Sequence, residues 1–555
     1  MKIKSIKKVL AVALAVAFIS PVGLPNSASA AKHGGAQDIN ETPVADLKPG
    51  GTFRFVQVDL CPNFNTSALQ GNLLNCSQVM AMMLPSYMDF DKNAKLAINK
   101  NYALDIKASK VAGKQTVVYT LNPKAKWNNG KTIGLADFVG HWNALKATGQ
   151  GYNITSSVGY EKIVSVKKGK TANEIVVTFS EIYPDWQALF GSLLPASVTA
   201  SPDAFNNLWK NGPTITTGSF RYVATDKVAR TILLERNPKW WGDRPVLDKI
   251  LFKVLPQVAQ IDALINGEVD YMDIANDSNA LTRARGSAKL SVRLAKAPTH
   301  EHFTFGPVTE VTKDVAVRQA IMLSIDRQQI ATAIQGVVDP KVKPNNGHIF
   351  LDGVACRQDN TGNLGKRDLK AAAKLLDGAG WAMGNDGIRA KGGTRLSVKL
   401  IYPSGNVNRR DTVLLASAMA KEAGIELVPT LIPSADYFLK FVLVSKFELA
   451  IFAWSGTNFP ISSTSNLYSV GKPQNFGNIG NAKIDDLFKK ANNILDPAKR
   501  CALANEADKE IYQIVHSITL FQRNNVVGVP KNVANFGAFG FTGIDWTKVG
   551  FKKTK

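Results

Sequence analysis

Phe447-Glu-Leu-Ala-Ile-Phe-Ala-Trp454 and the segment that follows it, Ser455-Gly-Thr-Asn-Phe-Pro460, give the first indication of the fold. An apolar run of strand length ends in a Trp and a Gly-containing loop. In α/β proteins, ligands bind in the crevice beyond the carboxyl ends of strands. We interpret the stretch as one wall of a binding cleft. The alternative is a buried strand followed by an ordinary turn, so the rest of the chain must decide.

The chain is too long for one hydrophobic core. At 555 residues, two or three domains are expected. Hydrophobic residues make up 45% and charged residues 20%, which is an ordinary globular balance. This balance argues against wholesale disorder and against a membrane protein with many spans.

Residues 1–30 have the three parts of a secretory signal peptide. Four lysines precede an apolar run at 9–19 that is too short to span a bilayer, and Ala28-Ser-Ala30 matches a cleavage site. The alternative, an N-terminal membrane anchor, is disfavoured by that length. The first Cys is Cys61, so a lipidated N-terminus is not expected. The mature protein is therefore predicted to be periplasmic or extracellular and not a lipoprotein.

The chain is strongly basic. Removal of the four signal-peptide lysines lowers the formal charge from +23 to +19. Such a charge could attract nucleic acid, anionic envelope polymers or acidic solutes. No run of five or more basic residues with interleaved aromatics occurs, so we favour a solvated basic surface and expect no nucleic-acid partner.

Four cysteines in an exported chain indicate disulfides. Three pairings are possible, and we favour Cys61 with Cys76 because that pair closes a short loop. Cys356 and Cys501 then form the second pair. Zinc is the weaker interpretation because no Cys-x-x-Cys occurs.

His300 and His302 are the exception among otherwise dispersed histidines. Two residues apart on a strand, they would point the same way, as metal ligands can. Because no helical His-Glu-x-x-His spacing and no nearby third ligand accompany them, a structural role is favoured. No metal or cofactor is expected.

Apolar periodicity predicts an alternation of strands and helices. Strands are expected at 52–58, 115–121, 174–179, 217–223, 230–237, 247–255, 395–402, 425–431, 447–454 and 517–522. Helices are expected at 72–83, 135–145, 259–266, 314–325, from 326, and at 368–376, 411–422, 436–444, 485–492 and 497–515. The α/β alternation after Cys356 predicts a second lobe.

Six collinear segments resemble one known family. They are Trp127-Asn-Asn-Gly-Lys-Thr132 with Ala136-Asp-Phe138; Thr217 to Trp241, ending in Arg236-Asn-Pro-Lys-Trp-Trp241; Gly267-Glu-Val-Asp270; Asp314 to Ile321 with Ser324 to Arg327; Ala373 to Leu376 with Gly380-Trp381; and Ile484 to Leu487 with Asp496 and Arg500. On these segments the chain resembles the large extracytoplasmic solute-binding proteins of ABC transporters, family 5, whose members bind oligopeptides, dipeptides or nickel. The likeness runs from about Gly51 to the C-terminal region.

The resemblance implies an α/β, two-lobed periplasmic-binding-protein-like fold (class II, large type) with a hinge. A signal peptide at 1–30 and a flexible leader at 31–46 would precede it. Lobe I would comprise 47–85, 206–307 and 519–555, with an extra subdomain inserted at 86–205. Lobe II would comprise 308–518.

The resemblance also implies a function without catalysis. The protein would capture a peptide or similar small solute between its lobes and deliver it to an ABC permease and its ATPase, acting as a monomer. The expected ligand contacts are Gln57, Asp59, Phe303, Phe305, Trp454, Ser455, Gly456, Thr457 and Asn458. Trp454 and Phe305 would supply apolar walls, and the polar loop residues would supply hydrogen bonds.

The chain departs from the family at Thr457. Peptide-binding members usually carry an Asp shortly after the Trp, and that Asp pairs with the peptide's ammonium. Peptide is the default ligand, and a non-peptide solute such as an oligosaccharide is the alternative. A secreted hydrolase is disfavoured because neither Gly-x-Ser-x-Gly nor His-Glu-x-x-His occurs. A periplasmic chaperone or receptor on the same fold stays open, since fold does not fix function.

Overall fold

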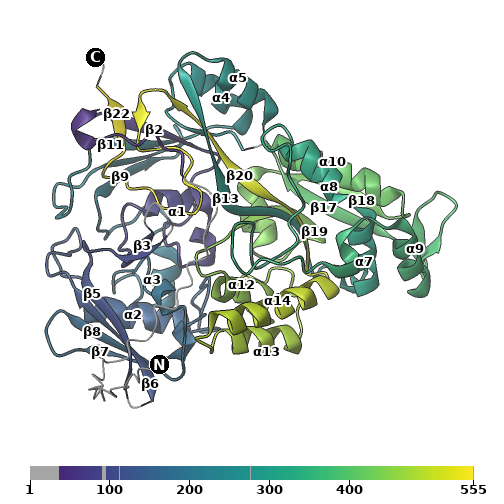
Figure 1. Ribbon diagram of the computed structural model, residues 1–555, viewed down its shortest axis with the longest axis horizontal. Helices are drawn as coiled ribbons and strands as arrows, with labels where there is room; N and C mark the ends of the chain where they lie inside the picture. Colours follow the sequence, from purple (N-terminus) through teal and green to yellow (C-terminus); the bar gives the residue numbers. More distant parts are fainter. Residues whose placement is uncertain (1–36, 91–94, 112, 276, 554–555) are drawn as a thin grey trace, which may run out of the picture.

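The computed structural model describes residues 37–90, 95–111, 113–275 and 277–553 (Figure 1). The predicted signal peptide and residues 31–36 lie outside this range. The described residues form an α/β protein whose two halves are joined by one shared sheet.

The largest sheet has the strand order β12-β20-β13-β19-β17-β18. Its strands are β12 (Met272–Asp273), β13 (Leu290–Phe305), β17 (Ser397–Pro403), β18 (Glu426–Ile432), β19 (Leu449–Ser455) and β20 (Ser517–Pro530). A second sheet, β2-β11-β10-β9, contains β2 (Thr52–Gln57), β9 (Phe220–Asp226), β10 (Thr231–Arg236) and β11 (Lys249–Val254). A third, β5-β6-β8-β7, contains β5 (Ala103–Val111), β6 (Lys114–Leu121), β7 (Ile163–Lys168) and β8 (Glu174–Phe179).

Three small sheets complete the strands. They contain β1 (Leu47–Lys48), β21 (Val533–Ala534) and β22 (Gly550–Lys552); β3 (Met88–Phe90) and β4 (Leu96–Ile98); and β14 (Ala382–Met383), β15 (Arg389–Lys391) and β16 (Thr394–Arg395).

Helices pack against the sheets in both halves of the molecule. They are α1 (Leu74–Met80), α2 (Leu135–Lys146), α3 (Pro202–Asn207), α4 (Gln257–Ile265), α5 (Ser278–Gly286), α6 (Glu310–Lys313), α7 (Val315–Ser324), α8 (Arg327–Gln335), α9 (Leu369–Gly378), α10 (Val407–Lys421), α11 (Ser434–Asp436), α12 (Pro460–Tyr468), α13 (Ala482–Ala491) and α14 (Pro497–Gln513). Among the described residues, no helix has the length and apolar character needed to cross a membrane.

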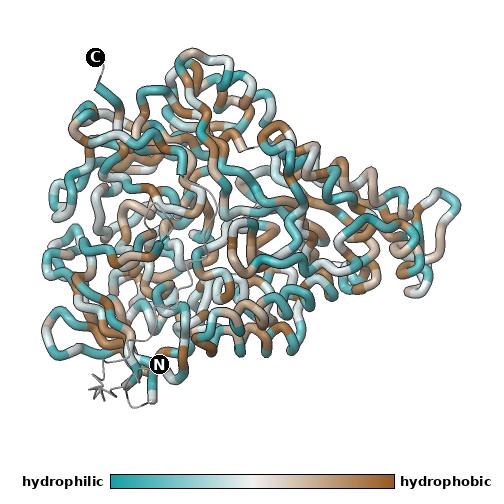
Figure 2. Tube along the Cα trace, in the orientation of Figure 1, coloured by the Kyte–Doolittle hydropathy of each residue, from teal (hydrophilic) through white to brown (hydrophobic). Residues whose placement is uncertain are grey.

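Two large apolar cores lie on either side of the molecule, and Figure 2 shows the apolar segments in the interior of both halves. The first core gathers buried side chains from 53–295 and 526–549, and the second from 303–521. The antiparallel strands β13 and β20 pair along most of their length and contribute to both cores. These two strands therefore connect the half of the molecule that contains the first core with the half that contains the second core.

Local sequence signals explain several helix starts. Asp314 caps α7 by accepting a hydrogen bond from the Ala316 N–H, and Asp326 caps α8 through the Gln329 N–H. The predicted helix pair at these positions is confirmed. The stretch Phe447 to Trp454 is also confirmed as a strand, β19, which is buried along most of its length.

Two predicted elements need correction, and one helix was not predicted. The strand expected at 517–522 continues to Pro530, because its second part pairs with β13 beside the first core. The helix expected at 436–444 is α11 followed by a π-helical segment, Tyr437–Val442. A helix that was not predicted, α12, follows the loop after Trp454 because Pro460 fits its first turn.

The leader predicted to be flexible is held in place over residues 37–46. Asp38 forms backbone hydrogen bonds with Ala538, and Arg293 donates to the Ile39 carbonyl at 2.9 Å. Asn535 bonds the backbone of Thr42 in both directions. Polar composition suggested flexibility, but these partners come from distant parts of the chain and satisfy the leader's backbone groups.

The disulfide prediction is confirmed. Cys61 pairs with Cys76, and Cys356 pairs with Cys501. The first bond fixes the loop after β2 to α1, and the second ties the segment before α9 to α14.

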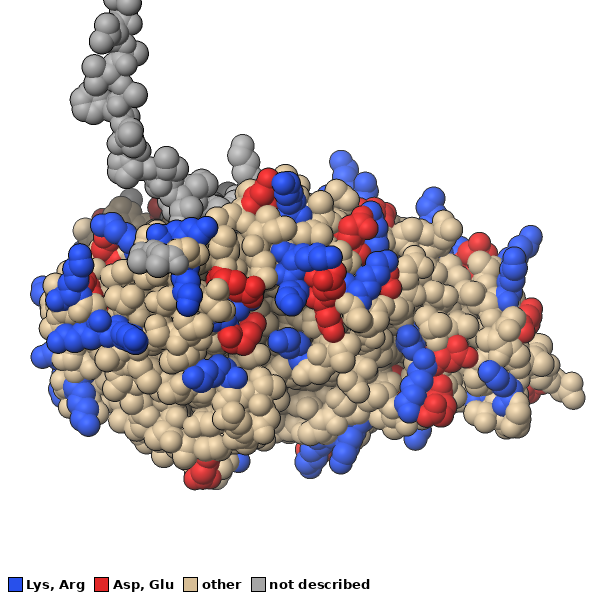
Figure 3. All heavy atoms as spheres, turned by 90° about the horizontal axis from the view of Figure 1, so that it is seen from below, with Lys and Arg blue, Asp and Glu red and all other residues tan. Residues whose placement is uncertain are grey.

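Charged side chains are spread over the surface. Figure 3 shows one face on which acidic residues stand among the basic ones over much of its length. This distribution agrees with a solvated basic surface.

Candidate ligand-binding site

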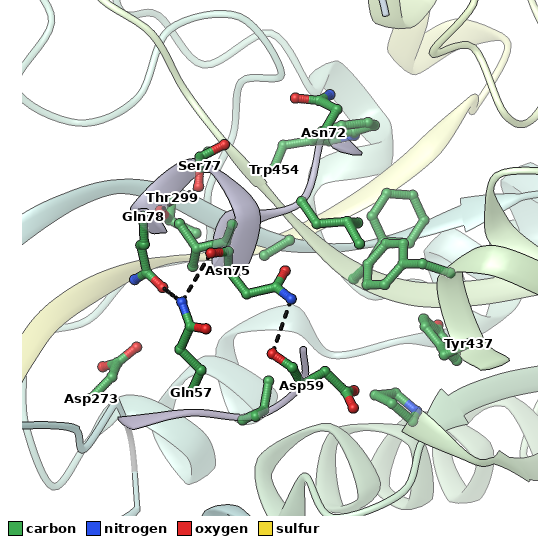
Figure 4. A pocket seen from close by; sticks show the side chains of 18 of the residues that line it. Gln57, Asp59, Asn72, Asn75, Ser77, Gln78, Asp273, Thr299, Tyr437 and Trp454 are labelled. Carbon is green, nitrogen blue, oxygen red and sulfur yellow. Dashed lines mark hydrogen bonds between the residues drawn. The ribbon is translucent and has the colours of Figure 1, made fainter. Parts of the chain in front are cut away.

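A cavity of about 2050 Å³ lies between the two halves and is lined by both. Typical small-molecule sites measure roughly 300–1,000 Å³, so this cavity has room for an extended ligand. The first half contributes the end of β2 and the start of α1 (Figure 4). The second contributes the ends of β17 and β19 and the segment around Tyr437.

Gln57 and Asn75 build a polar wall on the first half. The Gln57 amide donates to the Asn75 carbonyl oxygen at 2.9 Å and to the Gln78 amide oxygen at 3.1 Å, as Figure 4 shows. The Asn75 amide in turn donates to the carbonyl oxygens of Asp59 and Leu60. These bonds hold the loop after β2 against α1.

Trp454 forms the facing apolar wall at the carboxyl end of β19. Its ring stacks on Phe476 at 5.7 Å between centroids and meets Phe452 edge-on at 5.4 Å. The next loop is tied to β13, because the Gly456 N–H donates to the Pro298 carbonyl. The Thr457 hydroxyl accepts from the Phe459 N–H and bonds the Ser463 hydroxyl, so the loop is set by the start of α12.

One hydrogen bond crosses the cavity directly. The Ser434 hydroxyl donates to the Asp59 carboxylate at 2.8 Å. Arg230 bonds the other Asp59 oxygen at 3.0 Å. The loop after β2 therefore contacts the opposite half at the start of α11.

The acidic side chains that line the cavity all have partners. They are Asp59, bonded to Arg230; Asp226, bonded to the N–H groups of Val228 and Ala229; Asp273, bonded to Arg523; and Glu301, bonded to Arg409. The last two pairs form a network on the cavity wall, because Arg523 also lies 3.9 Å from Glu301. A ligand ammonium would have to compete with a cation or with backbone N–H groups for each carboxylate.

The two spaced histidines on β13 do lie on one face, with ring centroids 5.5 Å apart. His300 lines the cavity, and neither of its ring nitrogens has a hydrogen-bond partner in the protein. Burial lowers the pKa of His300 to about 4, so the ring is neutral at pH 7. Within the described residues, no group of three or more His, Cys, Asp or Glu side chains is arranged to hold a metal ion.

Six of the nine predicted contacts line the cavity, namely Gln57, Asp59, Trp454, Ser455, Gly456 and Thr457. Phe303 and Phe305 are wrong as cavity-lining residues, since both are fully buried in the second core with α7 and α8. Strand β13 reaches the cavity at Ala297 to Glu301 instead. Asn458 also lies outside the lining, because the chain turns there into α12.

The charged network was not predicted from the sequence, and His300 was expected to have a structural role. Glu301 is the one charged residue between Ala297 and Gly306, in a segment that otherwise reads as a buried strand, and this was a usable signal. Arg409 and Arg523 gave none, because their partners lie more than a hundred positions away in the sequence.

The sequence of the chain is similar to those of one family of known proteins. Residues 103–476, more than half of the chain, match the model of the bacterial extracellular solute-binding proteins, family 5, middle region. The oligopeptide-binding protein OppA of Mycobacterium tuberculosis is 34% identical over 533 residues, which cover 95% of this chain and 89% of that protein.

Solved structures share the fold. The oligopeptide-binding protein AppA from Bacillus subtilis, in complex with a nonapeptide, has a TM-score of 0.81 at 20% identity, covering 91% of this chain and 100% of that one. A periplasmic EDTA-binding protein, EppA, also has a TM-score of 0.81, at 22% identity and with 93% and 98% of the chains covered. The chain therefore belongs to the bacterial extracellular solute-binding proteins of family 5.

Proposed function

We propose that this protein captures a peptide in the cavity between its halves and delivers it to the permease and ATPase of an ABC transporter. The observation that carries the proposal is a cavity of about 2050 Å³ walled by both halves of the chain. The names of the relatives support a peptide, because OppA is an oligopeptide-binding protein and AppA holds a nonapeptide. The protein works by binding and lobe closure, without covalent chemistry.

The proposed lobes follow the predicted boundaries. Lobe I is 47–85, 206–307 and 519–555 with the insertion at 86–205, and lobe II is 308–518. Strands β13 and β20 act as the hinge, and the Asp59–Ser434 hydrogen bond helps to hold the closed form. The chain is exported by a cleavable signal peptide, is not a lipoprotein, and acts as a monomer outside the membrane.

Native mass spectrometry of gently purified protein, followed by thermal-shift measurements, tests the proposal. We expect a peptide to co-purify, and penta-alanine rather than maltopentaose to raise the melting temperature. A ligand at a hundred times its dissociation constant stabilises the folded state by about 2.7 kcal/mol. Stabilisation by maltopentaose alone would assign an oligosaccharide site, and no effect from either would contradict small-solute capture.

The charge distribution narrows the proposed ligand. Thr457 is uncharged and every lining carboxylate already has a partner. A peptide with a blocked amino terminus should therefore bind about as well as one with a free ammonium. We expect penta-alanine and N-acetyl-penta-alanine to have dissociation constants within about threefold of each other, because no charge-assisted bond of about 1.5–3 kcal/mol is lost on acetylation.

Thr457→Asp is expected to strengthen penta-alanine binding by roughly tenfold. An Asp at this exposed position adds a partner for the ammonium, at the lower end of the range for charged hydrogen bonds because solvent screens it. Its carboxylate can still accept from the Phe459 N–H and lies near the start of α12, where negative charge is favoured. Calorimetric titration measures the change.

Thr457→Asn is the matched control, since it has nearly the shape of Asp without the charge. It should leave the affinity within about twofold of the original protein, and the Asp variant should gain nothing with N-acetyl-penta-alanine. Equal affinity of the Thr457→Asp variant and the original protein for penta-alanine would show that the ammonium binds elsewhere.

A further inference from the structure

His300 presents unused hydrogen-bonding groups to the cavity. The residue is only 3% exposed, yet it lines the cavity on β13, directly across from Trp454 on β19. Neither Nδ1 nor Nε2 has a hydrogen-bond partner within the protein. Because a buried polar group without a partner destabilises the state that contains it, such a group at the wall of a cavity indicates a partner that enters the cavity from outside the chain.

The other buried histidines differ from His300 in one of two ways. His302, on the same strand, also has both ring nitrogens without a hydrogen-bond partner, but it does not line the cavity. His141 has both ring nitrogens bonded, to the Tyr160 hydroxyl and to the Leu194 N–H. His348, which also lines the cavity, is bonded to Asp508 at 2.7 Å and faces the Ser517 carbonyl at 3.3 Å. His300 therefore differs from His141 and His348 in lacking internal hydrogen bonds, and from His302 in facing the cavity.

We propose that His300 is a ligand-recognition residue, and that the bound solute places an uncharged group with both a donor and an acceptor, such as an amide, against its ring. This inference rests on the proposed capture of a solute in the cavity. A neutral imidazole has one N–H donor and one acceptor nitrogen. An amide matches both, whereas an ammonium offers only donors and a carboxylate only acceptors.

The neighbourhood of His300 favours an uncharged partner. The charged groups near its ring, Glu301 and Asp508, are already bonded to Arg409 and His348 respectively. Trp454 lies beside the site and can cover the apolar part of a peptide unit. The subsite therefore suits a peptide backbone or a carboxamide side chain better than a charged terminus.

Calorimetric titration of penta-alanine into dialysed protein tests the recognition role. We expect His300→Phe to bind at least about fivefold more weakly and His300→Gln, which keeps a donor and an acceptor, to recover most of the affinity. His302→Phe is the matched control, because His302 is as buried and lies on the same strand but does not line the cavity. Original affinity in His300→Phe, or an equal loss in His302→Phe, would overturn the proposal.

Thermal melting without ligand gives a second, independent readout. Because the ring has no internal partner, His300→Phe or His300→Leu should melt at the same temperature as the original protein or higher. His141→Phe should melt lower, since it breaks two hydrogen bonds. A loss in both His300 variants as large as in His141→Phe would show that the ring is bonded inside the protein, which refutes the inference. If penta-alanine does not bind the original protein, peptide capture fails, and the melting comparison still decides the state of His300.

Discussion

Arg500→Met is expected to lower the free energy of unfolding by about 3–5 kcal/mol, because it leaves a buried carboxylate without its cation. Arg500 on α14 bonds Asp185 at 2.7 Å, and both side chains are 9% exposed. Arg500 also donates to the Ala491 carbonyl, which fixes it against the end of α13. The ion pair joins the segment after β8 to the helices of the opposite half. Urea unfolding followed by circular dichroism measures the loss.

Two controls isolate the buried pair. Lys509→Met removes an ion pair with Glu506 on the same helix, where both partners are about half exposed, and should cost less than about 1 kcal/mol. The double variant Arg500→Met with Asp185→Leu should recover most of the stability, because no unpaired charge remains. If the Arg500→Met protein were as stable as the Lys509→Met protein, water would already solvate Asp185.

Trp454→Ala is expected to weaken penta-alanine binding by about 30-fold or more, corresponding to at least about 2 kcal/mol. Trp454 forms the apolar wall of the cavity and packs on Phe452 and Phe476. Truncation removes the surface that covers the ligand and loosens the aromatic cluster behind it. Calorimetric titration well below the melting temperature separates the affinity from the accompanying loss of stability.

Trp454→Phe should keep part of the affinity, because a smaller ring still fills the wall. Trp142→Ala is the matched control, since Trp142 lies on α2, is partly buried and does not line the cavity. The Trp142→Ala protein should bind penta-alanine with the same affinity as the original protein. Unchanged binding in Trp454→Ala would remove the strand β19 wall from the site and would assign the ligand to another part of the cavity.

The sequence indicated the site best at the carboxyl ends of strands. Trp454 to Thr457 and the segment Gln57 to Asp59, predicted as ligand contacts, line the cavity, and a strand that ends in polar residues is a local pattern that the sequence displays. Phe303 and Phe305 were misplaced, although their strand was the right one. Along β13 the chain passes from cavity to core within a few residues, and alternation alone does not tell which part of a strand faces the ligand.

The sequence by itself determined many of the longer strands and helices, the disulfide pairing and the stretch Phe447 to Trp454 as a strand that ends at the cavity. These features follow from periodicity, capping residues and short-range spacing, which involve neighbouring positions. Only the tertiary structure decided which groups pair with the carboxylates that line the cavity. Asp59 and Ser434 are 375 positions apart and Glu301 and Arg409 are 108 apart, so no local pattern records their contact. Only the tertiary structure could likewise show that the His300 ring has no hydrogen-bond partner, because this can be seen only when the positions of all its neighbours are known.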